Sequence, residues 1–254
     1  EICRLESTFE EVLARHDYPA PVRELLGQTM AGVALMAAML KLEGSLILQV
    51  QGDGPVSLLM AESNERGEIR AIARYDEEAD LAAASWTALT GQGQLLLTID
   101  PHDGQRYQGV VPLEGDTLAA ALSNYFLQSE QLPTQFWLFS EGEAAAGLML
   151  QVLPGHDDDS DDEDIWARSV NLANTLRSSD MLDLPAEEVL YRLYHEEEVE
   201  LFPARALCFK CSCTRERSAS ALRTIEPDEL REIAAEQGGY EHHGLYAHII
   251  HKKS

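Results

Sequence analysis

Residues 21–60, PVRELLGQTM AGVALMAAML KLEGSLILQV QGDGPVSLLM, contain the two patterns that decide the fold. The first half places apolar side chains at helical spacing, which predicts a helix over residues 21–42 with Pro21 in its first turn. Its many Ala and Gly residues would allow other elements to pack closely on it. The second half predicts a β-hairpin, with strands at 46–51 and 56–60 joined by a turn at 52–55.

Short apolar runs between turn residues continue this pattern to about residue 153. They predict further strands at 69–74, 94–99, 106–111, 136–139 and 148–153. A helix is expected over 117–129, with Asp116 as its N-cap. We therefore predict an α+β fold, in which a mostly antiparallel sheet packs with helices and is followed by a helical linker and a small C-terminal metal or redox unit.

The composition changes sharply after Pro154 and Gly155, which divides the chain into an α+β body (1–155), an acidic linker (156–203) and a C-terminal unit (204–254). The linker carries 15 acidic and three basic residues. It keeps helical spacing at 165–176 and 186–195, so a weakly held helical region that can open is expected. The alternative is a solvated helical spacer.

The C-terminal unit has about 50 residues, with a helix expected at 227–237 before Gly238 and Gly239. A unit of that size buries little core, so a structural metal would be the expected source of its stability.

The charge of the chain excludes some classes of partner. Nineteen Lys and Arg residues stand against 44 Asp and Glu among 254 residues, a formal net charge of −25. Binding to nucleic acid or to an anionic membrane surface requires clustered basic residues, which are missing. The apolar, uncharged stretch at residues 25–40 is shorter than the roughly 20 apolar residues of a membrane span. A soluble, cytoplasmic protein is expected.

Three of the four cysteines, Cys208, Cys211 and Cys213, lie within six residues, and Cys3 stands apart. Clustered thiols in a cytosolic chain indicate metal binding or redox chemistry. Cys211 and Cys213 could both bind one zinc ion, which would need two further ligands, and Cys208 could supply a third thiolate. Nearby basic residues favour the thiolate form: Lys210, Arg215 and Arg217. The alternative is a set of partly buried thiols without a ligand.

Six separated segments resemble the 33 kDa chaperonin family, the redox-regulated heat-shock holdases of bacteria, in the order that the family shows. They are residues 51–55 (QGDGP), 106–111 (RYQGVV), 113–119 (LEGDTLA), 129–134 (SEQLPT), 190–198 (LYRLYHEEE) and 209–217 (FKCSCTRER). The resemblance implies an ATP-independent chaperone that binds unfolding proteins under heat and oxidative stress. It also implies a homodimer when activated, a metastable linker and a C-terminal zinc switch.

In that family, four cysteines hold zinc when reduced, and oxidation forms two disulfides, expels zinc and unfolds the linker. The resemblance places the first cysteine pair, a zinc and disulfide pair, at Cys211 and Cys213. No cysteine follows Cys213, and histidines stand in place of the second pair: His242, His243, His248 and His251. We therefore expect weak or absent zinc and an impaired switch, so that the chain acts without prior oxidation. The alternative is that His242, His243 or His248 completes the zinc site.

Two other functions fit some of these features. The C-terminal Cys and His residues could form the centre of a metal-dependent hydrolase, although neither His-Glu-x-x-His nor Gly-x-Ser-x-Gly occurs. The linker and tail could instead form a constitutive dimerisation or interaction module. We expect no enzyme and no catalytic residues. We also expect that no nucleotide drives activity, because the sequence has no phosphate-binding loop with its lysine, and residues 91–94 are interpreted as a turn before a strand.

Overall fold

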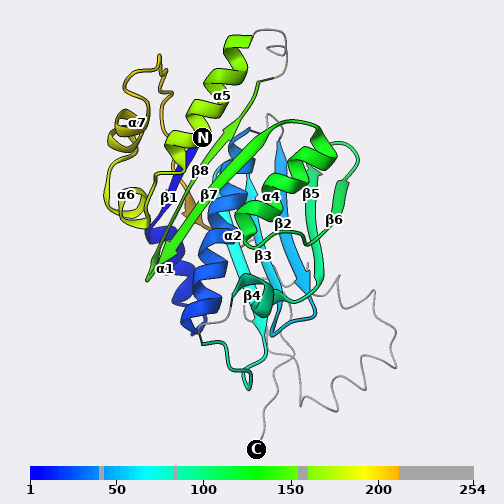
Figure 1. The fold of residues 1–254 in the computed structure, drawn as a ribbon. Helices are drawn as coiled ribbons and strands as arrows, with labels where there is room; N and C mark the ends of the chain where they lie inside the picture. The colour runs from blue at the N-terminus through cyan, green and yellow to red at the C-terminus, as the bar shows by residue number, and fades with distance from the viewer. Residues whose placement is uncertain (40–42, 83–84, 154–159, 212–254) are drawn as a thin grey trace, which may run out of the picture. The chain divides into compact units, whose positions relative to one another are not determined.

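The long helix α2 (Ala20–Met39) lies between two β-sheets and forms the centre of the fold (Figure 1). This computed structural model describes residues 1–39, 43–82, 85–153 and 160–211, without the side chains of 160–164. Twelve α2 residues are buried, because the helix contacts strands of both sheets. Gly27 allows this close packing: a Cβ there would lie 2.2 Å from the Ser140 Oγ. The helix predicted over 21–42 is confirmed as far as residue 39.

The larger sheet contains six strands in the order β6-β5-β2-β3-β4-β9. Its strands are β2 (Gly44–Gly52), β3 (Val56–Asn64), β4 (Glu68–Tyr75), β5 (Gly93–Pro101), β6 (Tyr107–Pro112) and β9 (Cys208–Phe209). All neighbours are antiparallel except β4 and β9, which are parallel. The predicted hairpin and the three strands after it are therefore confirmed, whereas β9 was not predicted.

The smaller sheet has the order β1-β8-β7 and is antiparallel throughout. Its strands are β1 (Ile2–Leu5), β7 (Thr134–Glu141) and β8 (Ala144–Gln151). β7 and β8 cover the predicted strands near 136–139 and 148–153. β1 was not predicted, because four residues are too few to show the alternation of apolar and polar side chains that marks a strand. The α+β class with mostly antiparallel sheets is confirmed.

The helix after β6 differs from its prediction at its start. Helix α4 (Leu118–Tyr125) begins after Thr117, whose side chain accepts a hydrogen bond from the Ala120 N–H, so Asp116 is not the N-cap. A π-helical turn, η1 (Phe126–Glu130), continues the helix to the expected end. Two short helices were not predicted: α1 (Ser7–Leu13) and α3 (Trp86–Thr90).

Three helices follow the smaller sheet: α5 (Ser160–Ala173), α6 (Ser178–Asp183) and α7 (Ala186–Tyr194). The contacts of the chain divide it into two units, residues 1–209 and 210–254. Only Lys210 and Cys211 of the second unit are described, so the helix expected at 227–237 lies outside the described residues. The expected boundaries at 155 and 203 remain predictions.

Candidate functional site

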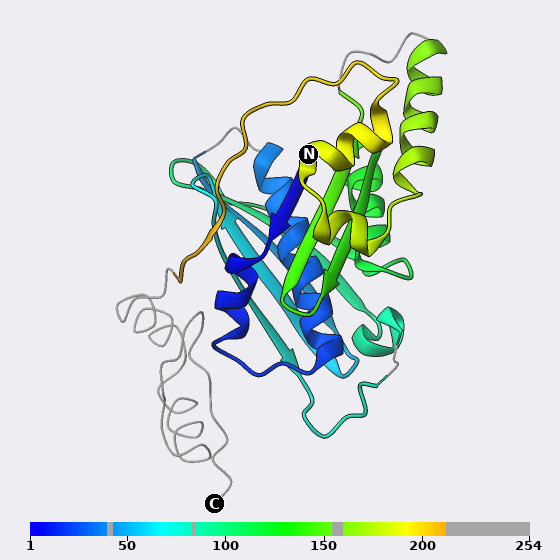
Figure 2. The same cartoon turned by 90° about the vertical axis from the view of Figure 1, so that its left-hand side faces the viewer.

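The three-stranded sheet is buried on both faces, and its outer face is covered by the linker helices (Figure 2). Successive side chains of a strand point to opposite faces. In β8, Ala145 and Met149 belong to the main core around α2, whereas Ala146 and Leu148 belong to a second cluster with the linker. In β7, Trp137 likewise packs in the second cluster. The sheet thus has an apolar outer face that would be exposed without α5–α7.

The linker helices contribute a small set of buried side chains to this cluster: Ala173, Met181, Val189, Leu193 and Tyr194. Full burial of a large apolar side chain is worth about 1.5–3 kcal/mol. The linker is therefore a packed cover of the sheet, and the alternative interpretation as a solvated spacer is wrong for its described helices.

A few polar contacts fix the cover to the sheet. The Trp137 Nε1–H donates to the Asn174 Oδ1 at 3.0 Å, just beyond the end of α5. Arg4 of β1 donates to the Leu184 carbonyl at 2.7 Å and also to the Leu182 carbonyl. A cation is favourable at these carbonyls, because the C-terminus of a helix carries partial negative charge. Arg4 thus connects the first strand of the body to the end of α6.

Contacts inside the linker hold its helices to one another. The Tyr194 hydroxyl donates to the Ser169 carbonyl at 3.2 Å, and burial raises the pKa of Tyr194 to about 12. Arg168 donates two hydrogen bonds to the Glu197 carboxylate, at 2.5 and 3.0 Å, and these hold the pKa of Glu197 below its ordinary value. Exposed ion pairs of this kind contribute little to stability, because solvent screens them.

The balance of these terms predicts a weakly held cover. Residues 156–203 have 15 acidic side chains against three basic ones, so the segment repels itself. Against this repulsion stand a few buried side chains and mostly exposed polar contacts. A segment with such a small apolar contact area is expected to open more easily than the rest of the unit.

The cysteines expected to form the switch are only partly described. Cys208 is exposed in β9, and Cys211 follows with intermediate exposure. Cys213 and the histidines considered as zinc ligands, His242, His243 and His248, lie outside the described residues. Among the residues that the structure describes, which end at Cys211 and leave out the gaps named above, no group of three or more His, Cys, Asp or Glu side chains is placed to hold a metal.

Cys3 differs from the clustered thiols in its surroundings. Its Sγ lies 3.6 Å from the Ala31 carbonyl, on the side of β1 that faces α2. Burial is the main cause that raises the pKa of Cys3, to about 12. A thiol with so high a pKa is almost entirely protonated at neutral pH and reacts slowly with oxidants.

The strand before Cys211 is attached to the edge of the larger sheet. Glu68 and Ile69 of β4 pair with Cys208 and Phe209, and the Cys208 N–H donates to the Gly67 carbonyl at 2.9 Å. Gly67 has a φ of +73°, which a residue with a Cβ rarely adopts, and a Cβ there would lie 2.4 Å from the Ala206 carbonyl.

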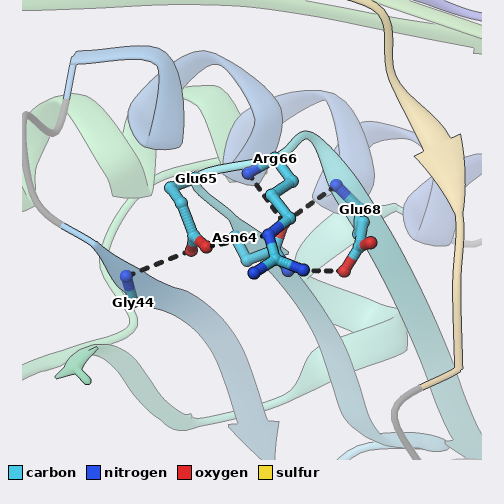
Figure 3. A network of polar contacts seen from close by, with 5 residues as sticks. All are labelled: Gly44, Asn64, Glu65, Arg66 and Glu68. Atoms are coloured by element: carbon cyan, nitrogen blue, oxygen red, sulfur yellow. Dashed lines mark hydrogen bonds and ion pairs between the residues drawn. The ribbon is translucent and has the colours of Figure 1, made fainter.

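Side-chain hydrogen bonds shape the turn that presents Gly67 (Figure 3). The Asn64 Oδ1 accepts from the backbone N–H groups of Arg66 and Glu68, both at 3.0 Å. The Asn64 Nδ2 donates to the Glu68 carboxylate at 2.8 Å, and the Glu65 carboxylate accepts from the Gly44 N–H at 3.1 Å. The turn between β3 and β4 is thereby fixed where β9 docks.

Sequence reasoning missed the residues that hold the linker, Arg4, Trp137 and Asn174. One signal was present: β8 contains the apolar run AAAGLML (144–150), and strands buried on both faces have such continuous runs. Residues 51–55, the first of the six segments that resemble the family, have a structural role. Asp53 of the β2–β3 turn accepts from the Gln92 N–H at 2.7 Å and donates its own N–H to the Gln92 carbonyl at 2.9 Å.

Comparison with known proteins identifies the class of protein that has this covered sheet and this thiol segment. The family model described as "Hsp33 protein" matches residues 1–246, and the chain belongs to this family. Curated relatives are named 33 kDa chaperonin. That of Ectopseudomonas mendocina is 48% identical over 241 residues, covering 94% of this chain and 82% of the relative. That of Shewanella loihica is 46% identical, covering 95% and 83%.

The fold has a solved counterpart. The crystal structure of the 33 kDa chaperonin (heat shock protein 33 homolog) of Thermotoga maritima superposes with a TM-score of 0.78 at 24% identity. The match covers 94% of this chain and 85% of that one. The family resemblance predicted from the sequence is thus confirmed, and the chain is a chaperone by family. None of the helices in the described ranges combines the length and apolar character needed to span a membrane.

Proposed function

We propose that this chain is an ATP-independent holdase that binds unfolding polypeptides on the sheet face under α5–α7. The observation that carries the proposal is the second apolar cluster, in which an acidic linker covers the outer face of β1, β7 and β8. Unfolded chains expose apolar side chains, so they would bind such a face once the cover opens. The strong net negative charge would help to keep the complexes soluble.

Oxidation of Cys211 and Cys213 is the step that would regulate an intact switch. Two thiols and one hydrogen peroxide molecule give one disulfide and two water molecules, so the thiols lose two electrons and two protons. The neighbouring Lys210, Arg215 and Arg217 support thiolate formation at this pair. Zinc is expected to bind weakly or not at all, because two thiolates are half of a tetrahedral set and histidines would have to complete it.

The proposal also covers the partners of the chain, its oligomeric state and its cellular location. The partners are unfolded or partly folded proteins, the activated chain forms a homodimer, and it acts in the cytoplasm without a catalytic step. Because the switch is expected to be impaired, the reduced chain should already protect these unfolding client proteins from aggregation, and peroxide should add little.

Light scattering of a heat-denatured client would test the proposal, with reduced and oxidised protein compared and the zinc content measured in both. Suppression of aggregation by the reduced chain, with little bound zinc, is the expected result. Tight stoichiometric zinc with no protection before oxidation would mean that histidines complete the switch. No protection in either state would overturn the holdase function.

A further inference from the structure

Residues 207–209 occupy a docking site on the body that is separate from the linker-covered sheet. Leu207 and Phe209 are half-buried and pack against the main core, while Cys208 between them is exposed. This alternation is that of a strand with one inward face. The segment thus binds its own body as an extended peptide with apolar side chains at alternate positions.

Three residues of the body define what this site accepts. The Thr8 hydroxyl, which is buried, donates to the Leu207 carbonyl at 3.1 Å. The Gly67 carbonyl accepts from the Cys208 N–H. The Arg15 guanidinium lies 3.8 Å from the centre of the Phe209 ring, a cation–π contact. Two of these interactions involve the peptide backbone, so any sequence of suitable apolar pattern could make them.

The segment is held over a short length and is therefore replaceable. β9 pairs with β4 at two positions only, and residues 198–206 before it are exposed and form neither helix nor strand. Further along this edge of β4, the Ala73 N–H donates to the buried Tyr18 hydroxyl at 3.3 Å, so a strand that replaced β9 would pair with residues 67–69. A sheet edge with so short a partner can exchange it for another strand.

We propose that the site made by Thr8, Arg15, Gly67 and the edge of β4 is a second client site, which residues 207–209 occupy as an internal competitor. Its ligand is an extended segment of an unfolded chain with an aliphatic residue at one position and an aromatic residue two positions later. This inference rests on the proposed holdase function, but it concerns a different surface and a different mode of binding. Backbone pairing gives affinity, and the two inward side chains give selectivity.

The test uses a fluorescent hexapeptide that copies residues 205–210 with Ser in place of Cys208, Arg-Ala-Leu-Ser-Phe-Lys. Its binding is measured by anisotropy with the full chain and with the double variant Leu207→Ser/Phe209→Ser, which removes the internal competitor. Loss of the competitor should strengthen binding at least tenfold. In the same background, Arg15→Ala should weaken it about two- to fivefold. Arg106→Ala, which removes an exposed cation elsewhere, should leave it unchanged.

A matched control peptide replaces the Ser with Pro, which has no N–H to donate to the Gly67 carbonyl, and it should bind at least fivefold more weakly. If the double variant does not fold, amide hydrogen exchange of the unaltered chain replaces it: added hexapeptide should speed the exchange of the Cys208 N–H. Equal binding of both peptides, or no change in that exchange, would overturn the proposal.

The two functions fail separately. A chain that suppresses aggregation but shows none of these peptide effects retains the holdase function and lacks this site. A chain that binds the hexapeptide as described without protecting any client has the site, and the proposed function is then wrong.

Discussion

Leu193→Ala should open the linker without any oxidation. Leu193 is 8% exposed on α7 and belongs to the cluster that covers the outer face of the three-stranded sheet. Replacing a buried leucine by alanine costs about 2–5 kcal/mol, and a site at the edge of a small cluster belongs near the lower end, about 2–3 kcal/mol. Since 1.4 kcal/mol is a factor of ten, the open population should rise roughly 30- to 140-fold.

The matched control is Tyr191→Ala on the same helix, because Tyr191 is 71% exposed. Alanine is the best helix former, so neither variant lowers the intrinsic stability of α7 and only the packing differs. Hydrogen exchange of residues 165–194 measures opening, and light scattering with reduced protein measures client protection. Leu193→Ala should exchange faster and protect at lower concentration, whereas Tyr191→Ala should match the unaltered chain.

Two results would refute this reasoning. Equal exchange in both variants would mean that the cluster does not hold the linker. Faster exchange in Leu193→Ala with no gain in client protection would mean that the sheet face under the linker is not the client surface.

Peroxide followed by mass mapping should modify Cys211 and Cys213 before Cys3, because burial raises the pKa of Cys3 to about 12; earlier modification of Cys3 would contradict this. Arg4→Gln should weaken α6 docking by about 1–3 kcal/mol, seen as faster exchange in α6, since two carbonyls at its end lose a charged donor. The raised pKa of Tyr194 means that its contribution is full below its unfolded pKa of about 10 and is lost as the pH rises through about 12. Tyr194→Phe should remove that alkaline step in linker exchange; a step that persists would assign it to other groups. Added salt should slow linker opening. The Debye screening length falls from about 10 Å at 0.1 M to about 3 Å at 1 M ionic strength, which weakens the repulsion among the acidic side chains of the linker.

The elements that sequence reasoning predicted are those with enough residues to show the periodic spacing of apolar side chains typical of a helix or a strand. Helix α2 and the strands β2 to β5 have eight or more residues each, so their apolar spacing is visible in the sequence alone. β1 and β9 have four and two residues, and their structure depends on the strands beside them. The N-cap of α4 was misplaced by one residue because Asp116 and Thr117 are both good capping residues and only the backbone distinguishes them.

The candidate site was predictable in composition but not in contacts. The charge of the linker and its helical spacing are properties of the sequence, and they indicated a weakly held element. Which surface it covers depends on residues distant in the chain, such as Arg4 beside the end of α6 and Trp137 beside Asn174. Nothing in the local sequence around Arg4 or Trp137 marks either residue as a partner of the linker.

The linker cover and the docked segment 207–209 follow one another in the chain before Cys211, and this order has a consequence for activation. Between them, residues 198–206 are exposed and form neither helix nor strand. Nine such residues can extend to about 30 Å, so release of the docked segment need not pull on α7. The linker and the docked segment are therefore held by separate contacts. An apolar cluster holds the linker, whereas two hydrogen bonds, the Arg15–Phe209 contact and the packing of two side chains on the main core hold residues 207–209. Because the docked segment is shorter and lies nearer to the thiols, it should be the first to leave, and the edge of β4 should accept a client segment before the linker opens.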